Sequence, residues 1–132
     1  MASERSAIET NEAPAPIGPY SQAIRHGDLL FCSGQLPIEP STGELVKADA
    51  SGQARRCLEN LDAVCRAAGT SLTSALRVTL YLTDMRDFAR VNEAYADFFP
   101  STPPARVAIQ AAALPRGAEV EMDAVVAIGR AS

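Results

Sequence analysis

The stretch SGQARRCLENLDAVCRAAGTSLTSALRVTLYLT, residues 51–83, sets the architecture, because its hydrophobic periodicity changes once along its length. As far as Ala68, apolar residues recur at intervals of three and four, which is the spacing of one face of an α-helix. Gly69 then offers the left-handed conformation in which many helices end. From Leu76 to Leu82, apolar and polar residues alternate, as in a strand with one buried face. We therefore expect a helix over 51–68 and then a strand.

Further strands are expected upstream of this unit. Residues 20–25 and 29–33 flank His26-Gly27-Asp28, whose Gly and Asp favour the reversal of two strands into a hairpin. A weaker strand pattern covers residues 7–10. Residues 37–43 include a Pro-Ser-Thr-Gly turn and are predicted to be a loop.

A second helix and two more strands are expected downstream. Thr83 or Asp84 caps a helix that Pro100 stops. Strand patterns then cover residues 106–114 and 119–128. The order β-β-β-α-β-α-β-β predicts an α+β fold, with a single two-layer domain in which a six-stranded mixed sheet carries two helices on one face.

The other face of the predicted sheet needs a cover of its own. Ile109, Ala111, Ala113 and their neighbours leave few polar residues to meet water there. A large exposed apolar face is rare in a monomer, so we expect a partner subunit to bury it.

The composition is that of one ordinary globular domain. The chain has 132 residues, 47% hydrophobic and 21% charged, and we interpret residues 1–132 as one domain with a partly loose segment at 1–12. The net charge of −4 disfavours nucleic acid, whose binding depends on clustered Lys and Arg. No apolar run approaches the roughly 20 residues that cross a bilayer, and residues 1–12 lack the apolar stretch of a secretory signal. The expected location is the cytoplasm, without membrane contact.

Metal binding is not expected. Cys32, Cys57 and Cys65 show no Cys-x-x-Cys spacing, and His26 is the single histidine. We interpret all three cysteines as reduced thiols.

Arg106 is the first candidate for chemistry. It follows Pro103-Pro104-Ala105, a stiff segment that fixes how the chain enters the strand. Its planar guanidinium suits a carboxylate held by two parallel hydrogen bonds. A surface salt bridge at the start of a strand is the alternative interpretation.

An acidic stripe on the last strand is the second candidate. Glu119, Glu121 and Asp123 alternate with apolar residues, which places three carboxylates about 7 Å apart on one face. This can simply be a solvated face. The functional hypothesis is that one of these carboxylates lies across the sheet from Arg106 and moves the protons of a reacting water.

Four other residues could line a site, and each has a structural alternative. Tyr20 follows the turn Gly18-Pro19, and Ser33 and Gly34 offer a hydroxyl and an accessible backbone amide at a strand end. Asn92 lies in the middle of the second helix, where Asn is a mediocre helix former. The alternatives are a tyrosine that covers the core edge, ordinary turn chemistry and a surface asparagine.

Several short motifs occur in an order that resembles the RidA/YjgF family of reactive-intermediate deaminases. They are Ile17-Gly18-Pro19-Tyr20-Ser21-Gln22, Ser33-Gly34-Gln35-Leu36-Pro37, Leu58-Glu59-Asn60-Leu61, Val91-Asn92-Glu93-Ala94-Tyr95 and Pro104-Ala105-Arg106. The resemblance covers about residues 13–128. It implies a chorismate-mutase-like homotrimer with active sites at the subunit interfaces.

The resemblance also implies an activity and its residues. The expected enzyme hydrolyses 2-enamine or 2-imine acids, such as 2-aminoacrylate or 2-iminopropanoate, to 2-keto acids and ammonia, without a metal or cofactor. Arg106 matches the residue that binds the substrate carboxylate, and Glu121 matches the glutamate that orients water and moves protons. Tyr20, Ser33, Gly34 and Asn92 match residues that line the cleft. Ala108 stands where many relatives have Cys, which puts any role for a thiol there in doubt.

Two other functions stay open from the sequence. A pathway-specific deaminase, for example one acting on an aminomuconate, keeps the fold and changes the substrate. A binding or regulatory protein is the alternative from another class, since members of such families are described as translation inhibitors, ribonucleases or chaperones.

Overall fold

The computed structural model describes residues 4–129. Six strands form one sheet in the order β1-β2-β3-β8-β6-β7, and two short strands form a separate hairpin. Sheet neighbours run antiparallel except β6 and β7, which are parallel, so the sheet is mixed as predicted. The elements are β1 (Ser6–Ile8), β2 (Ala23–His26), β3 (Leu29–Gln35), β4 (Ile38–Glu39), β5 (Glu44–Leu45), α1 (Ala50–Ala67), β6 (Ala75–Leu82), α2 (Phe88–Ala96), β7 (Ala105–Gln110) and β8 (Val120–Ala127).

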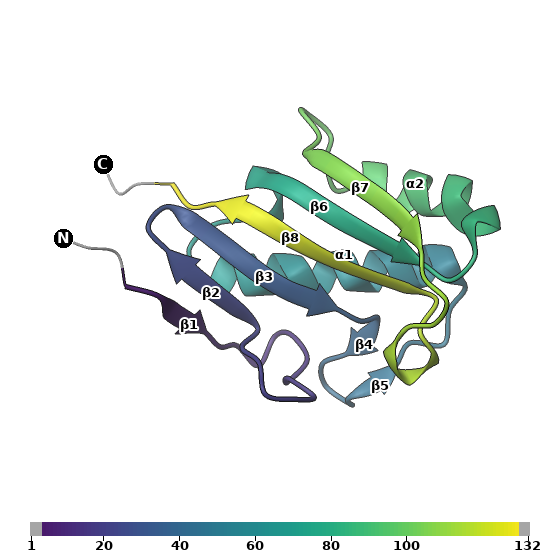
Figure 1. Ribbon diagram of the computed structural model, residues 1–132, viewed down its shortest axis with the longest axis horizontal. Helices are drawn as coiled ribbons and strands as arrows, with labels where there is room; N and C mark the ends of the chain where they lie inside the picture. The colour runs from purple at the N-terminus through teal and green to yellow at the C-terminus, as the bar shows by residue number, and fades with distance from the viewer. Residues whose placement is uncertain (1–3, 130–132) are drawn as a thin grey trace.

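Both helices lie on one face of the sheet, which confirms the two-layer prediction (Figure 1). α1 begins after Asp49, whose carboxylate accepts a hydrogen bond from the Gly52 amide, and it ends before Gly69, whose φ is +85°. The core between helices and sheet is made of fully buried aliphatic side chains, among them Leu58, Leu61, Val64, Val78, Leu80, Val91, Met122 and Val126. Burial of these apolar groups is the main force that holds the two layers together.

The structure confirms the predicted order of the six sheet strands and two helices. Two predicted starts differ, because β2 begins at Ala23 instead of residue 20 and a short 3-10 turn separates Asp84 from α2, and three further local features differ as well. β4 and β5 pair where a loop was expected, because two-residue strands show no alternation that a sequence pattern could display. β7 ends at Gln110, and the chain leaves the sheet after the Ala111 amide donates to the Leu82 carbonyl at 2.7 Å. Leu76 is exposed, because the β6–β8 register shifts between Ala75 and Arg77.

The sheet face opposite the helices is uncovered in a single chain and exposes several large apolar side chains. Phe31 of β3 is 45% exposed, and Val107 and Ile109 of β7 are 40% and 44% exposed. The prediction of an uncovered face with exposed apolar side chains is therefore confirmed, but Glu121 and Asp123 of β8 also lie on this face. Its composition differs, because Ala111 and Ala113 lie beyond the end of β7. We call this surface the open face.

β3 contains an extra residue opposite β8. Cys32 pairs with Ala124 and Gln35 pairs with Met122, so three steps along β3 match two steps along β8. Such a β-bulge re-aims the side chains beside it and is common next to active sites. Here it displaces Ser33 and Gly34 from the regular ladder.

Two kinds of feature are absent from residues 4–129. No helix in this part of the chain is long and apolar enough to cross a membrane. In the same range, no group of three or more His, Cys, Asp and Glu side chains is arranged to hold a metal ion.

Candidate functional site

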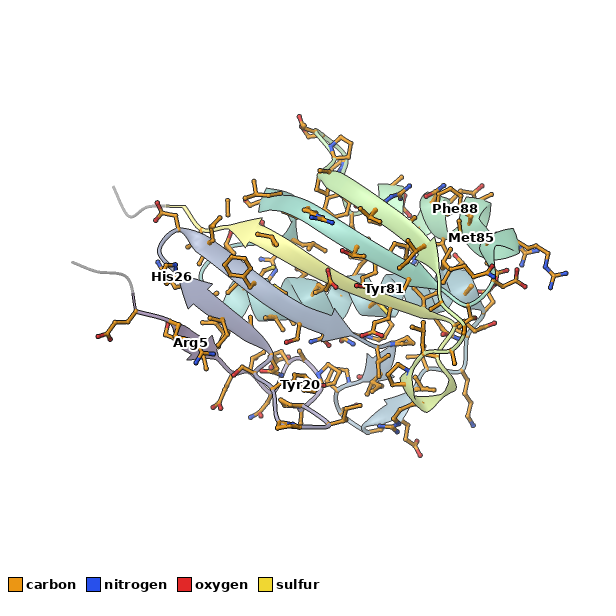
Figure 2. The ribbon with its side chains drawn as sticks, in the orientation of Figure 1. Arg5, Tyr20, His26, Tyr81, Met85 and Phe88 are labelled. Carbon is orange, nitrogen blue, oxygen red and sulfur yellow. The ribbon has the colours of Figure 1, made fainter. Side chains whose placement is uncertain are left out.

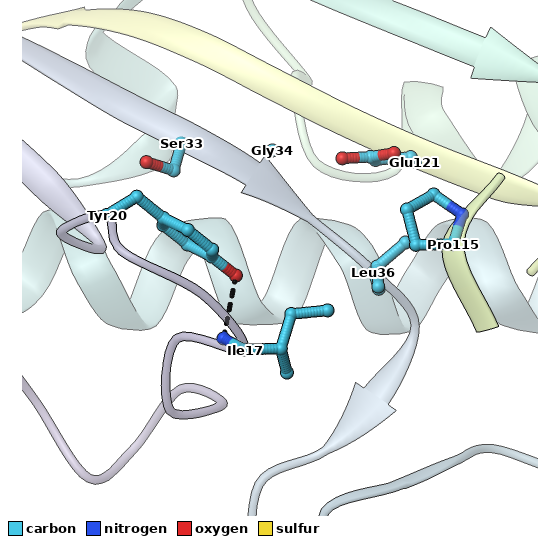
Figure 3. A pocket seen from close by; sticks show the side chains of 7 residues that line it. All are labelled: Ile17, Tyr20, Ser33, Gly34, Leu36, Pro115 and Glu121. Atoms are coloured by element: carbon cyan, nitrogen blue, oxygen red, sulfur yellow. Dashed lines mark hydrogen bonds between the residues drawn. The ribbon is translucent and has the colours of Figure 1, made fainter.

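A small hollow lies where β3 ends and β8 begins (Figure 3). It measures about 270 Å³, close to the lower end of the roughly 300–1,000 Å³ of small-molecule sites. We call it the carboxylate hollow. It is lined by Ile17, Tyr20, Ser33, Gly34, Leu36, Pro115 and Glu121. Four of the residues predicted from sequence therefore lie together: Tyr20, Ser33, Gly34 and Glu121.

Glu121 supplies the acid of the hollow. It alternates with the buried Val120 and Met122, so its side chain points to the open face. Burial, and then the negative charge of Asp123, raise the pKa of the Glu121 carboxyl above its usual value. A carboxyl with a raised pKa can exchange protons with a reacting group near neutral pH more readily than an ordinary one.

The three acids of the predicted stripe have separate surroundings. The Glu119 carboxylate accepts a hydrogen bond from the Gln53 side chain of α1 at 2.8 Å. The Asp123 carboxylate accepts one from the Tyr81 hydroxyl at 2.9 Å. Glu121 is the acid of the three that lines the hollow, which supports choosing it within the stripe.

Gly34 makes room for this carboxylate. A Cβ placed on Gly34 would contact the Glu121 carboxylate oxygen and lie 3.1 Å from its Cδ. The bulge brings the β3 backbone close to the Glu121 carboxylate, and glycine, which has no side chain, leaves room for that carboxylate. The sequence pattern Ser33-Gly34 suggested an accessible backbone here, and the structure adds the reason for the glycine.

Tyr20 and Ser33 place two hydroxyl groups at the hollow (Figure 3). The Tyr20 hydroxyl accepts a hydrogen bond from the Ile17 amide at 3.2 Å, so its own proton can be donated elsewhere. The Ser33 hydroxyl donates to the Ser21 carbonyl at 2.6 Å, so its lone pairs can accept. The two groups thus offer one donor and one acceptor to a bound ligand.

Arg106 lies in a different place, between the edge strand β7 and α2. Its Nη1 donates to the Asn92 side-chain oxygen at 2.9 Å. Its guanidinium carbon lies 4.8 Å from the centre of the Tyr95 ring and 5.4 Å from that of Phe88. Phe88, Asn92 and Tyr95 recur along one face of α2, so a single helix face orients the cation. We call Arg106 with these three residues the arginine platform.

The guanidinium keeps most of its hydrogen-bonding capacity. Within residues 4–129, Asn92 is the one side chain that accepts a hydrogen bond from it, and no Asp or Glu forms an ion pair with it. Arginine carries about five N–H donors in a planar fork. A half-buried arginine with this unused fork is suited to bind an anion from outside the chain.

Arg106 and Glu121 point to opposite faces of the sheet. Arg106 of β7 pairs with Val78 of β6, and Val78 pairs with Ala124 of β8. Val78 and Ala124 are buried against the helices, so this row of side chains lies on the helix face. Glu121 pairs with Tyr81 of β6, and both side chains lie on the open face. In Figure 2, Phe88 of the platform and Tyr20 of the hollow also lie far apart. The hypothesis that an acid of the stripe lies across the sheet from Arg106 is therefore wrong for a single chain.

Some residues of the carboxylate hollow and of the arginine platform could not be recognised as site residues from the sequence. Ile17, Leu36 and Pro115 carry no polar group, and only their place beside the acid makes them part of the hollow. By spacing alone, Phe88 and Tyr95 belong to the apolar stripe of the second helix. Phe88 lies four residues before Asn92 and Tyr95 three residues after it, so all three share one helix face. This spacing was a signal that the two rings could pack against a cation bound by Asn92. Ala108 lies two residues after Arg106 on β7, packed against the core.

Comparisons with known proteins agree with this fold. Residues 10–128 match the family described as Endoribonuclease L-PSP. The chain is 54% identical over 121 residues to the RutC family protein y4sK of Sinorhizobium fredii, covering 92% of this chain and 96% of that protein. It is 43% identical over 125 residues to the mouse 2-iminobutanoate/2-iminopropanoate deaminase, covering 95% and 93%. The crystal structure of E. coli TdcF with bound serine superposes with a TM-score of 0.88 at 41% identity, covering 94% and 99%.

Proposed function

This chain belongs to the Endoribonuclease L-PSP family, which includes the RidA/YjgF proteins, and from that membership we propose that it is an imine deaminase. The reaction converts a 2-enamine or 2-imino acid, such as 2-aminoacrylate or 2-iminopropanoate, and water into a 2-keto acid and ammonia. The observation that carries the proposal is Arg106, a half-buried arginine that no acid among residues 4–129 pairs with, on an aromatic and amide platform. The mouse relative named as such a deaminase supports the assignment.

Arg106 binds the substrate carboxylate in this proposal. Asn92 holds one side of the guanidinium, and the rings of Phe88 and Tyr95 hold its plane, so the other donors are oriented before substrate arrives. Two parallel charge-assisted hydrogen bonds would then fix both the position and the rotation of the substrate. Ala108, on the same strand two residues further on, adds no reactive group.

Glu121 moves the protons. The imine carbon is electrophilic, so a water oxygen bonds to it while the Glu121 carboxylate accepts a proton from that water. The same carboxyl returns this proton to the imine nitrogen, which gives a carbinolamine. The carboxylate then accepts the proton of the new hydroxyl group and passes it to the same nitrogen, so the C–N bond breaks, the keto group forms and ammonia leaves. Tyr20 and Ser33 orient the water and the nitrogen. The chemistry requires no metal or cofactor.

Two copies of the chain must contribute to each site, because Arg106 and Glu121 of one copy point to opposite faces of the sheet. The hollow opens on the open face, whose Phe31, Val107 and Ile109 call for a cover. Arg106 lies on the edge strand β7, within reach of a neighbouring copy. We therefore propose a homotrimer in which the arginine platform of one copy meets the carboxylate hollow of the next.

The ribonuclease activity in the family description is not favoured. The chain carries a net charge of −4, and phosphate backbones are bound by clustered cations.

Mixing two inactive variants tests the reaction and the shared site together. Arg106→Ala and Glu121→Gln chains are unfolded, mixed and refolded, and loss of an imino acid generated by an amino-acid oxidase is followed. With random mixing, about a quarter of the interfaces combine an intact arginine with an intact glutamate, so about a quarter of wild-type activity should return. Each variant refolded alone is the control and should stay inactive. No recovery in a properly assembled mixture would show that the site is not shared.

A further inference from the structure

We propose that the carboxylate hollow continues into an apolar compartment that selects uncharged 2-imino acids with leucine- or methionine-sized side chains over the three-carbon imine and over dicarboxylic imines. This inference rests on the proposed function, since it names the substrate class of the same site. It also assigns Ile17, Leu36 and Pro115 as the residues that determine specificity.

The compartment is the part of the hollow away from the strands. Ser33, Gly34 and Glu121 come from β3 and β8, whereas Ile17, Leu36 and Pro115 come from three separate segments beyond them (Figure 3). Ser33 and Glu121 therefore lie on the strand side of the hollow, and the apolar groups lie on the other side, where the Tyr20 hydroxyl accepts the hydrogen bond from the Ile17 amide (Figure 3). At about 270 Å³, the hollow has roughly nine times the 30 Å³ of one liquid water. A three-carbon imino acid has only about six non-hydrogen atoms, so it leaves part of the apolar wall uncovered.

Specific hydrogen bonds fix each apolar wall. The buried Asn60 side chain donates to the Leu36 and Ile38 carbonyls at 3.1 and 2.9 Å. Ile17 is tied to the Tyr20 hydroxyl at 3.2 Å. A compartment held in this way is formed before the ligand arrives, so that ordering it on binding costs little.

The third wall depends on a strained residue. Arg116, next to Pro115, has a φ of 63°, the left-handed region that non-glycine residues rarely adopt. Its guanidinium donates to the Gly43 carbonyl at 3.1 Å, which ties this loop to the β4–β5 hairpin. The hydrogen bond also directs the Arg116 charge towards the hairpin, and Arg116 does not line the hollow.

The charges of the hollow disfavour a second carboxylate. Glu121 is the one acid among the lining residues, and Asp123 lies near it on the same strand face. No lysine or arginine of residues 4–129 lines the hollow. Arg106 of the neighbouring copy binds the first carboxylate of the substrate in the proposed site. The second carboxylate of a dicarboxylic imine would lie beside these acids with no further cation from the lining of the hollow, which is unfavourable in a partly buried site. An aminomuconate-like substrate is disfavoured for this reason.

A series of imino acids tests the compartment. Imines are generated in situ from alanine, 2-aminobutyrate, norvaline, leucine, methionine and glutamate, and their loss is measured with and without the protein. We expect kcat/KM to rise by about fourfold for each added methylene up to the leucine and methionine imines. The glutamate imine, similar in length to the methionine imine, should fall at least tenfold below it.

A matched pair of variants locates the effect. Ile17 is 52% exposed, so Ile17→Ala should fold, and it keeps the amide that binds Tyr20. It should lower the preference for the leucine imine over the alanine imine about fivefold. Leu45→Ala removes an apolar group that packs against the cluster of Leu36, Ile38 and Ala118 but does not line the hollow, so the substrate preference of this variant should match that of wild type.

The outcomes separate this inference from the proposed function. Hydrolysis of all the imines at similar rates would overturn the compartment and leave the deaminase assignment standing. Equal rates for the glutamate and methionine imines would overturn the charge argument, and an unchanged preference in Ile17→Ala would overturn the assignment of the wall. Hydrolysis of none of the imines would overturn both proposals.

Discussion

The arginine platform and the carboxylate hollow are built in opposite ways. The platform rests on regular structure, since one face of α2 holds a residue of β7. The hollow is assembled from a bulge and several loop segments. The cation and the acid of a single chain cannot neutralise each other, because they point to opposite sides of the sheet. Within one chain, both groups therefore stay available for substrate, and in the proposed trimer the cation of one copy and the acid of the next share a ligand.

The comparison also predicts how the two regions fail. Changes to the arginine platform should weaken binding of the substrate carboxylate, whereas changes to Glu121 in the hollow should slow the chemical step.

The largest effect is expected from Arg106→Lys. A lysine is a point charge and cannot make two parallel hydrogen bonds, so kcat/KM should fall at least several hundredfold, equivalent to about 3–4 kcal/mol. The binding of a keto-acid product, followed by calorimetry, should be lost as well. Arg55→Lys, which alters a surface pair with Asp97, is the control and should behave as wild type. A lysine variant within tenfold of wild type would rule out the two-bond clamp.

Glu121→Gln should lower kcat by about a hundredfold, within the usual contribution of general acid–base catalysis. The amide keeps the shape of the side chain and loses its basicity, so the variant should still bind the keto-acid product. Glu119→Gln and Asp123→Asn are the matched controls, because each alters an acid of the same stripe that is bonded elsewhere. If one of the controls loses more activity than Glu121→Gln, the assignment within the stripe is wrong.

A smaller effect is expected on stability. Burial and Asp123 raise the folded-state pKa of Glu121, so between the unfolded and folded pKa values the folded protein binds more protons than the unfolded one. Stability should therefore fall as pH rises through that window, and Glu121→Gln should lack this loss. Urea denaturation at fixed protein concentration, from pH 4 to pH 8, measures it. The free energy of unfolding of the variant should rise relative to that of wild type towards neutral pH. The same pH dependence in both proteins would contradict the burial of the Glu121 charge.

The smallest effect on activity is expected from the thiols. Cys32, Cys57 and Cys65 are all buried, and hydrogen bonding to Cys65 together with burial raises the pKa of the Cys32 thiol. A variant with all three changed to Ala should keep activity within about twofold, with some loss of core stability. A folded, assembled but inactive variant would make the thiol-free mechanism untenable.

The sequence predicted the regular elements better than the geometry of the site. Periodicity located α1, β6 and β8, because a single buried face dictates each pattern. The resemblance of short motifs chose Tyr20, Ser33, Gly34 and Glu121, which the fold brings to one hollow. The face of the sheet to which Arg106 points could not be predicted, since it depends on the parallel pairing of β6 with β7.

The bulge in β3 limits which single-residue deletions the protein can tolerate. Because strand side chains alternate with a period of two, the extra residue allows Cys32 and Gln35, three positions apart, to be buried on the same face. Deletion of residue 33 or 34 would move the Gln35 side chain from the buried face of the sheet to the open face and would displace the start of the following loop. Single-residue deletions should therefore be far more damaging here than in the turn around Gly43. In a library of one-codon deletions, survivors should be absent from the bulge even where some substitutions at Ser33 survive.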